Sequence, residues 1–250
     1  MQLSGNTVLI TGGTSGIGYA LAEAFLEAGS TVLVCGRSEK HLQEARAKHP
    51  ELQIRVCDTS QDEDRRGLLA WVRERFPGLN VLVNNAGVQR DVDLTRGLGE
   101  FLAGDNEIRI NLEAPIFLTG MFAPLLAQNQ GTLINVSSGL GFIIAAGMPV
   151  YSASKAGMHA FTMAMRAQFA KVGVKVFEIV PPAVDTNLNP QGRAKRGHFK
   201  AGLGAKEFVA AVMQGLTEDK PEIGYGMTAG LIHASRADLD KAFQQMNSRM

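Results

Sequence analysis

Short apolar runs alternate along the chain with longer stretches in which apolar residues recur every three or four positions. The short runs are near-continuous rather than strictly alternating, which is typical of strands buried on both faces of a parallel sheet. They predict strands at Thr7–Thr11, Thr31–Cys35, Gln53–Cys57, Val81–Val83, Thr132–Val136 and Lys175–Val180. The periodic stretches predict helices at Tyr19–Glu27, Glu39–Lys48, Asp62–Arg75, Met158–Lys171 and Lys206–Leu216. Right-handed crossovers then give an α/β fold, a single doubly wound parallel sheet with helices on both faces.

This alternation continues without a linker, a repeat or a low-complexity segment, so residues 1–250 are expected to form a single domain. It is interrupted at Thr186–Gly204, where glycines and a proline lie among basic residues. A long irregular loop in a compact domain is typical of a lid, which we expect at residues 186–204. The basic side chains fit either a solvated, mobile loop or the binding of a negatively charged substrate. They are Arg193, Lys195, Arg196, His198 and Lys200.

Composition narrows the class of protein further. Hydrophobic residues make up 45% of the chain, enough for a buried core, and the formal net charge is +1. A nearly neutral chain gives no electrostatic reason to expect nucleic acid or an anionic membrane as a partner. The N-terminus lacks the pattern of a signal peptide, and the longest weakly polar run, near Gly141–Tyr151, is far short of the roughly 20 residues of a spanning helix. A cytoplasmic protein without a membrane partner is therefore expected.

Two cysteines, Cys35 and Cys57, each close a predicted strand. They are interpreted as reduced, buried thiols, with a disulfide as the alternative. Neither has the spacing of a metal ligand, so no metal site is expected.

A glycine-rich loop joins the first predicted strand to the first helix, with the sequence Thr11-Gly-Gly-Thr-Ser-Gly-Ile-Gly18. Glycines let the backbone turn sharply and approach a pyrophosphate, and the following helix N-terminus offers N–H groups and the positive end of its dipole. The position between strand and helix is the one that dinucleotide binding requires. The cofactor-binding residues expected here are Gly12, Thr14, Ser15, Gly16, Ile17 and Gly18.

The end of the second strand indicates which dinucleotide binds. An NAD site would carry a carboxylate there for the ribose hydroxyls, but the chain has Gly36, Arg37 and Ser38 instead. A guanidinium at Arg37 suits a phosphate, so NADP(H) is expected in preference to NAD(H). A solvated loop arginine is the alternative. Asp58 and Thr59 follow the third strand on the adenine side, although Asp58 or Ser60 also fits the N-cap of the next helix.

Tyr151 and Lys155 lie four residues apart in a predicted helix and so share one face. A tyrosine has a pKa of roughly 10, and a neighbouring cation lowers it toward the range in which a phenol exchanges protons with an alcohol oxygen. The pair alone is weak, because any surface helix can carry it by chance.

In combination the motifs resemble those of the short-chain dehydrogenase/reductase family, over nearly the whole chain. They are the glycine loop, Asp58, Asn84-Asn-Ala-Gly87, Asn111, Ile134-Asn-Val-Ser-Ser138, Tyr151 with Lys155, and Pro181 through Thr186. The stretches Val136–Phe142 and Ile179–Thr186 also look like a bacterial branch associated with cell-envelope D-alanylation gene clusters. The resemblance implies a Rossmann fold and an NADP-dependent oxidoreductase.

The resemblance also implies roles for single residues. Tyr151 would be the general acid in reduction and the base in oxidation, Lys155 would lower its pKa and bind the nicotinamide ribose, and Ser138 would hold the substrate oxygen. Asn111 would support a water that links Lys155 to solvent. On the cofactor, Asn85, Ala86 and Gly87 would pack against the adenosine side, while Val184 and Thr186 would hold the carboxamide.

Two prolines carry further expectations. Pro115 cannot donate to the carbonyl of Asn111, four residues earlier, so we hypothesise a kink that lets Asn111 bind the relay water, unless a helix simply begins near Pro115. Pro181-Pro182 replaces the Pro-Gly usual in the family, which affects the expected loop path near the nicotinamide.

The expected function is hydride transfer between NADP(H) and a small alcohol or carbonyl substrate. Two alternatives are a non-catalytic NADP(H)-binding redox sensor, disfavoured by the complete set of catalytic residues, and a sugar epimerase or dehydratase, which usually carries a larger substrate domain than the remaining chain could form.

The walls of the substrate pocket are expected at Val88–Leu98, at Gly139–Val150 and in the lid. Core packing explains the apolar candidates in these segments equally well; they are Phe142, Ile143, Ile144, Met148, Leu188 and Phe199. Apolar helices around Tyr151–Ala170 and Asp105–Gln128 favour a homodimer or homotetramer.

Overall fold

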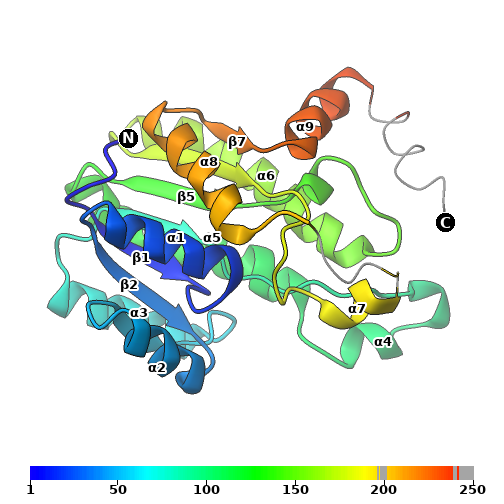
Figure 1. Cartoon of the computed structure of the whole chain (residues 1–250), viewed down its shortest axis with the longest axis horizontal. Helices are drawn as coiled ribbons and strands as arrows, with labels where there is room; N and C mark the ends of the chain where they lie inside the picture. Colours follow the sequence, from blue (N-terminus) through cyan, green and yellow to red (C-terminus); the bar gives the residue numbers. More distant parts are fainter. Residues whose placement is uncertain (196, 198–201, 239–240, 242–250) are drawn as a thin grey trace.

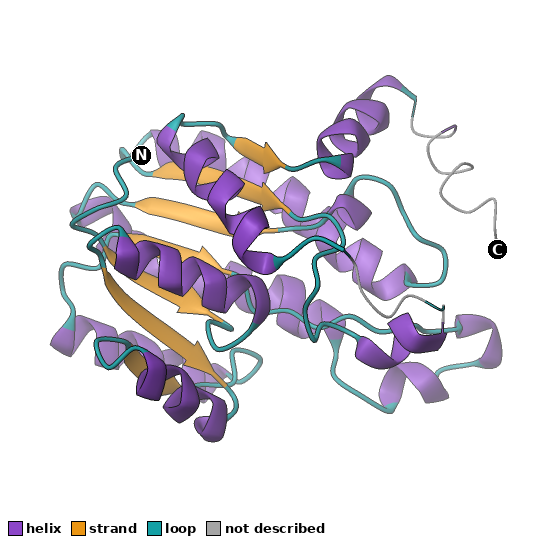
Figure 2. Ribbon diagram, in the orientation of Figure 1, coloured by secondary structure: helices purple, strands orange, loops and turns teal. Residues whose placement is uncertain are grey.

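The computed structural model of the chain describes residues 1–195, 197, 202–238 and 241. Within them a parallel seven-stranded sheet runs in the order β3-β2-β1-β4-β5-β6-β7 (Figures 1 and 2). The strands are β1 (Thr7–Thr11), β2 (Thr31–Gly36), β3 (Gln53–Val56), β4 (Val81–Asn84), β5 (Thr132–Val136), β6 (Lys175–Val180) and β7 (Glu222–Gly224). This is the doubly wound sheet that the continuous apolar runs predicted.

Helices pack on both faces of the sheet, as Figure 1 shows. One face buries side chains of α1 (Gly16–Glu27), α2 (Glu39–Lys48) and α8 (Ala205–Thr217). The other buries side chains of α3 (Asp62–Arg75), α5 (Ala114–Gln128) and α6 (Pro149–Ala170). Because alternate residues of each strand point to opposite faces, Val8 and Ile10 of β1 join the first core while Leu9 joins the second.

The direction of winding reverses at β1. Val8 pairs with Val32 of β2 on one side and with Val81 of β4 on the other. The connections that leave the carboxyl ends of β1 and β4 therefore diverge, and a crevice opens between them. This topology brings the glycine loop, the segment after β4 and the segment after β5 to one edge of the sheet.

Most predicted elements agree with the structure to within a few residues, with two differences. Helix α6 begins at Pro149, nine residues before the predicted Met158, because Pro149 occupies the first turn, where a missing N–H costs nothing. Strand β7 was not predicted, since three residues are too short for a period to show. It is followed by α9 (Met227–Ala237).

The segment 186–204 is partly helical rather than wholly irregular, because Pro190–Lys195 form α7. Asn189, at φ +87°, precedes this helix, and its Oδ1 accepts a hydrogen bond from the N–H of Gly192 at 2.9 Å. The lid candidates Arg196, His198, Phe199 and Lys200 lie outside the described residues.

The helix that carries Asn111 is not uniform. Residues Arg109–Glu113 form a π-helical turn, and α5 continues from Ala114 with Pro115 in its first turn. A local widening of the helix is a known response where a proline interrupts the i to i−4 ladder. The predicted interruption at Asn111 is therefore present, while the relay water stays a prediction.

The run Arg109–Gln128 corrects the hydropathy argument made from the sequence. An 18-residue window within this 20-residue run has a mean hydropathy of 1.4, so by length and composition the run is sufficient to cross a membrane. Half of that window is buried inside the protein, where Leu118, Phe122 and Leu126 pack in the second core. We interpret it as a core helix.

Candidate active site

The glycine loop after β1 is built around positions that accept no side chain. Gly12 and Gly16 have positive φ angles of +65° and +56°. A Cβ on Gly18 would lie 2.3 Å from Nδ2 of Asn85 and 2.4 Å from the carbonyl oxygen of Gly12. Asn85 in turn donates to the carbonyl oxygens of Thr11 at 2.9 Å and Gly12 at 3.2 Å, which ties the loop to the end of β4.

A cavity of about 910 Å³ lies along this edge of the sheet. Its lining contains every residue that the sequence assigned to the cofactor: Gly12, Thr14, Ser15, Gly16, Ile17, Gly18, Arg37, Asp58, Thr59, Asn85, Ala86, Gly87, Tyr151, Lys155, Val184 and Thr186. The N-terminus of α1 opens into the cavity at Gly16 to Gly18, where N–H groups suit a pyrophosphate. The size of the cavity and the glycine cradle together fit a dinucleotide.

Three polar side chains meet at the inner end of this cavity. Ser138 follows β5, while Tyr151 and Lys155 lie on successive turns of α6. All three are buried, with exposed fractions of 8%, 4% and 4%. The Lys155 ammonium donates to the carbonyl oxygen of Val136 at 2.8 Å and lies 5.8 Å from the centre of the Tyr151 ring. The structure therefore brings together the predicted proton donor, its neighbouring cation and the predicted substrate-holding hydroxyl.

The pKa values of Tyr151 and Lys155 are shifted by their burial. Burial raises the pKa of Tyr151 to about 12, opposed by a hydrogen bond with Ser138 and reinforced by the charge of Glu107. Burial lowers the pKa of Lys155 to about 8, opposed by the carboxylate of Glu178. The net pKa of Tyr151 in the chain alone is therefore raised rather than lowered, because removal of the phenol from water is the largest of these effects.

Asn111 does not line the cavity but supports it from behind. Its Oδ1 accepts from the N–H of Val88 at 2.8 Å, and its Nδ2 donates to the Val88 carbonyl at 2.8 Å and to the Ser154 hydroxyl at 3.0 Å. Ser154 donates to the carbonyl oxygen of Tyr151 at 2.7 Å. The fully buried Asn111 side chain therefore holds the segment after β4 against the first turns of α6.

Comparison with known proteins decides the family. The family model described as short chain dehydrogenase matches residues 6–197. The chain belongs to the short-chain dehydrogenase/reductase family. It is 42% identical over 250 residues to the uncharacterized oxidoreductase DltE of Bacillus subtilis, covering 100% of this chain and 99% of that protein. This relationship confirms the family and the branch that the motifs predicted.

Solved structures support the same assignment. A short chain dehydrogenase from Burkholderia cenocepacia in complex with NADP matches with a TM-score of 0.85 and 26% identity, over 98% of this chain and 99% of that one. A short chain dehydrogenase/reductase from Burkholderia phymatum in complex with NAD matches with a TM-score of 0.84 over 99% and 97% of the two chains. At 20% identity, the second likeness bears on the fold alone.

At the tip of β2, this short-chain dehydrogenase/reductase has a contact that the sequence analysis did not foresee. Nη1 of Arg37 lies 2.9 Å from Oδ1 and 3.0 Å from Oδ2 of Asp105, a residue that the sequence analysis did not single out. Ser38 is the N-cap of α2, since its hydroxyl accepts from the N–H of His41 at 3.3 Å. Sequence periodicity carries no signal for the Arg37–Asp105 pair, because it joins segments 68 positions apart.

Asp58 and Ser60 do not cap α3, which begins after Gln61. Asp58 instead accepts from the N–H and the hydroxyl of Ser60 at 3.0 and 2.8 Å. Its own N–H donates to the carboxylate of Asp64 at 2.7 Å. The segment is thus a closed turn that places Asp58 and Thr59 at the cavity rather than at a helix terminus.

The two cysteines agree with their prediction. Both are free and buried, and a hydrogen bond with Cys57, together with burial, raises the pKa of the Cys35 thiol. Cys57 also lines the cavity, and a buried thiol with a raised pKa is expected to react slowly.

The substrate side of the cavity is only partly as expected. Val88, Gln89, Gly139, Leu140, Met148 and Leu188 line it, whereas Phe142 and Ile143 are buried in the protein interior. Met227, Thr228 and Leu231 of α9 also line it, and sequence analysis missed them because their position depends on β7. Arg193 lines the cavity, but it donates to the Val184 carbonyl at 2.7 Å and lies 3.7 Å from Asp185. Within the described part of the lid, this basic side chain is therefore already paired.

A carboxyl group is buried one turn before Asn111. Glu107 is 0% exposed, and its Oε1 accepts from the N–H of Arg90 at 2.9 Å. Burial raises the pKa of Glu107 to about 7, opposed by the N–H and the charge of Arg90. A glutamate that holds a proton near neutral pH was not foreseen from the sequence, because burial of this position is a tertiary property.

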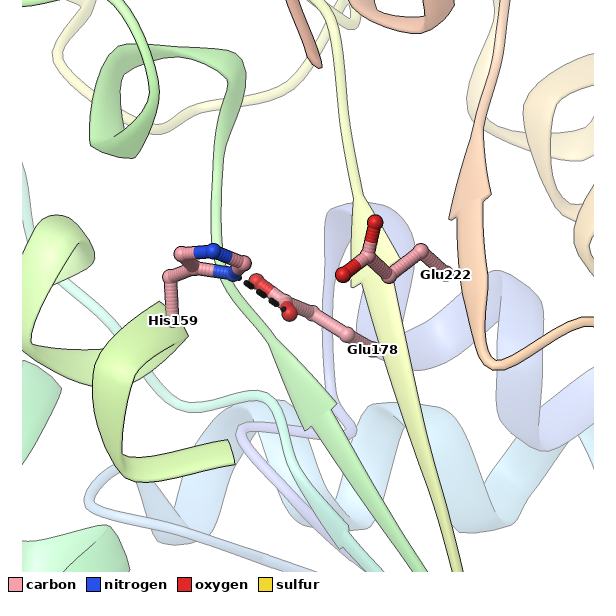
Figure 3. Close-up of side chains that lie close together, drawn as sticks. All are labelled: His159, Glu178 and Glu222. Carbon is pink, nitrogen blue, oxygen red and sulfur yellow. Dashed lines mark hydrogen bonds and ion pairs between the residues drawn. The ribbon is translucent and has the colours of Figure 1, made fainter. Parts of the chain in front are cut away.

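A separate charged cluster lies on α6, β6 and β7. Nδ1 of His159 is 2.8 Å from Oε2 of Glu178, and Glu222 lies beside them (Figure 3). The ligand-type atoms of these three residues lie within 4.8 Å of one another. Arg166 contacts Glu178 at 3.5 Å and Glu222 at 3.2 Å, so one guanidinium pairs with both carboxylates. We interpret the cluster as an ion-pair network; the expected lack of a metal stays a prediction. His159 is part of this network through its contact with Glu178.

Proposed function

We propose that the chain transfers a hydride between NADP(H) and a small alcohol or carbonyl substrate, with Tyr151 as general acid in reduction and general base in oxidation. The single observation that carries this proposal is the convergence of Ser138, Tyr151 and Lys155 at the inner end of a cavity that fits a dinucleotide. Members of the family act on small molecules, and the relatives include an oxidoreductase by name.

The protonation states favour the acid role in reduction. With its pKa raised to about 12, the Tyr151 phenol keeps its proton at neutral pH. With its pKa lowered to about 8, Lys155 is mostly charged at pH 7. A bound nicotinamide supplies or accepts the hydride. The chain supplies a hydroxyl pair, Ser138 and Tyr151, oriented to meet negative charge on a carbonyl oxygen, and Tyr151 gives up its proton to that oxygen.

Asn111 and the loop after β4 contribute by holding other residues of the site in place. The amide of Asn111 is engaged by Val88 and Ser154, so it holds α6 against the cavity rather than touching substrate. A relay water would have to use the Asn111 backbone carbonyl, which Pro115 cannot satisfy. We therefore assign Asn111 as a positioning residue, and the relay water as a part of the proposal.

The preference for NADP(H) over NAD(H) rests on Arg37 and Gly36. The structures that share this fold include complexes with NADP and with NAD, so the nicotinamide dinucleotide class is common to them. Arg37 lines the cavity at the tip of β2, where a guanidinium favours a 2′-phosphate. Gly36 leaves room, since a Cβ there would only reach Thr14 at 3.6 Å.

We also propose a cytoplasmic homodimer or homotetramer. Ile116 and Phe117 of α5 and Met163 of α6 are 41%, 46% and 52% exposed. Apolar side chains on two long helices are typical of a surface that another subunit covers. Sedimentation analysis of the purified chain tests this assembly directly.

The deciding experiment replaces the phenol. Tyr151→Phe removes the transferable proton and leaves the ring, so turnover of a panel of ketones and aldehydes with NADPH should fall by about 10²- to 10⁴-fold, while NADPH binding changes little. Tyr225→Phe is the matched control, because the Tyr225 hydroxyl contacts Glu207 outside the cavity lining. Retained turnover in Tyr151→Phe would contradict the acid assignment. A wild-type chain that binds NADPH but reduces nothing in the panel would favour the redox-sensor alternative.

A further inference from the structure

The side chain expected to recognise the 2′-phosphate already holds an anion from its own chain. One guanidinium nitrogen of Arg37 bonds both carboxylate oxygens of Asp105, at 2.9 and 3.0 Å. A carboxylate and a phosphate present the same charge-assisted acceptors to a guanidinium. Asp105 therefore engages one of the guanidinium nitrogens with which a phosphate oxygen could form a hydrogen bond.

The contact is exposed enough for a ligand to displace it. The side chains of Arg37 and Asp105 are 52% and 41% exposed. Exposed ion pairs contribute little to stability and weaken with salt. A dianionic phosphate brings more charge than one carboxylate, so it can compete for the same guanidinium.

Asp105 is held at this position by its own loop. Arg90 donates to the carbonyl oxygens of Phe101 at 2.9 Å and Asp105 at 3.2 Å, and also to that of Glu100. The N–H of Arg90 donates to the buried carboxyl group of Glu107 at 2.9 Å. The segment between α4 (Gly99–Leu102) and the π-helical turn is thus fixed to the loop after β4, which makes Asp105 a persistent neighbour of Arg37 rather than a chance contact.

We propose that Asp105 determines cofactor specificity: its carboxylate competes with the 2′-phosphate of NADP(H) for Arg37 and so moderates the preference over NAD(H). The inference rests on the proposed use of Arg37 by NADP(H). The competition acts only on the cofactor that carries the phosphate, because NAD(H) has a hydroxyl at that carbon. Asp105 should therefore change the ratio of the two affinities and not the affinity for both.

The test compares Asp105→Asn with the wild-type chain. Fluorescence titration with NADPH and NADH, and calorimetric titration with 2′,5′-ADP as the phosphate probe, give the dissociation constants. Asp105→Asn should tighten NADPH and 2′,5′-ADP by about two- to fivefold and leave NADH unchanged. The gain should shrink at high salt. Glu44→Gln is the matched control, since it removes one exposed carboxylate from α2 in a pair with Lys40.

A double-mutant cycle separates this inference from the proposed function. In an Arg37→Met background, Asp105→Asn should have no effect on NADPH, because the shared partner is gone. If Arg37→Met weakens NADPH but Asp105→Asn leaves the NADPH-to-NADH ratio unchanged or lowers it, the role of Asp105 is overturned and that of Arg37 stands. If Arg37→Met leaves the ratio unchanged, the NADP(H) preference falls and the inference falls with it. Asp105→Ser gives the same comparison should the asparagine form a substitute hydrogen bond.

Discussion

Glu107 offers the sharpest physical test of the interior beside the active site. Its folded-state pKa of about 7 compares with an ordinary value of 4.5. Between these two pH values the folded chain holds a proton that the unfolded chain has released. The free energy of unfolding therefore decreases as the pH rises from about 4.5 to about 7, and the loss is complete above the folded-state pKa.

The size of this loss follows from the shift. A difference of about 2.5 pKa units corresponds to at most about 3–4 kcal/mol. The effective dielectric constant of a buried site is well above that of dry protein, so we expect a value of about 1–2 kcal/mol. Glu107→Gln imitates the protonated carboxyl group and keeps an acceptor for the Arg90 N–H. The variant should match the wild-type chain near pH 5 and be more stable by about 1–2 kcal/mol at pH 8.

Urea unfolding at pH 5 and pH 8, followed by circular dichroism, measures both stabilities. Glu74→Gln serves as the control, because Glu74 is exposed on α3 and its replacement changes only a solvated charge. An identical pH dependence in the wild-type chain and Glu107→Gln would refute the reasoning. Glu107 would then be an ordinary ionised carboxylate despite its burial.

Two further predictions concern the glycine loop and the ion-pair network. Gly18→Ala should weaken NADPH binding more than tenfold, because its Cβ would lie 2.4 Å from the Gly12 carbonyl oxygen. Gly120→Ala, in α5 with nothing within 4 Å of the added Cβ, should leave NADPH binding unchanged and stabilise the helix by about 0.5–1 kcal/mol. Titration with NADPH and thermal unfolding distinguish the two variants, and equal NADPH binding by both would contradict the steric argument. Glu178→Gln should lower the free energy of unfolding by about 2–4 kcal/mol, because it breaks the buried contacts with His159 and Arg166. It should also move the alkaline loss of carbonyl reduction to lower pH, since the carboxylate helps Lys155 keep its proton. Denaturant unfolding and a pH–rate profile measure these effects, and an unshifted profile would show that Glu178 does not influence Lys155.

Local patterns in the sequence determined the fold class. Predominantly apolar runs such as Thr132–Val136 predicted buried parallel strands with correct bounds, because a strand covered on both faces has few side chains that meet water. The glycine-rich sequence likewise predicted the close turn between β1 and α1. Only glycine tolerates the close approach of Asn85 at Gly18 and the positive φ of Gly12 and Gly16, so the type of residue at these positions already indicates the backbone conformation.

Burial and long-range pairing were decided only by the tertiary structure. From the helix alone, Lys155 was expected to lower the pKa of Tyr151, yet desolvation is set by every element around the phenol and raises that pKa to about 12. The Arg37–Asp105 contact, the burial that raises the pKa of Glu107 and the cavity wall formed by α9 likewise depend on segments that are distant along the chain. The spacing of apolar residues along the sequence shows which face of a helix or strand is apolar. The electrostatic environment and the neighbours of a side chain depend instead on how the elements pack together.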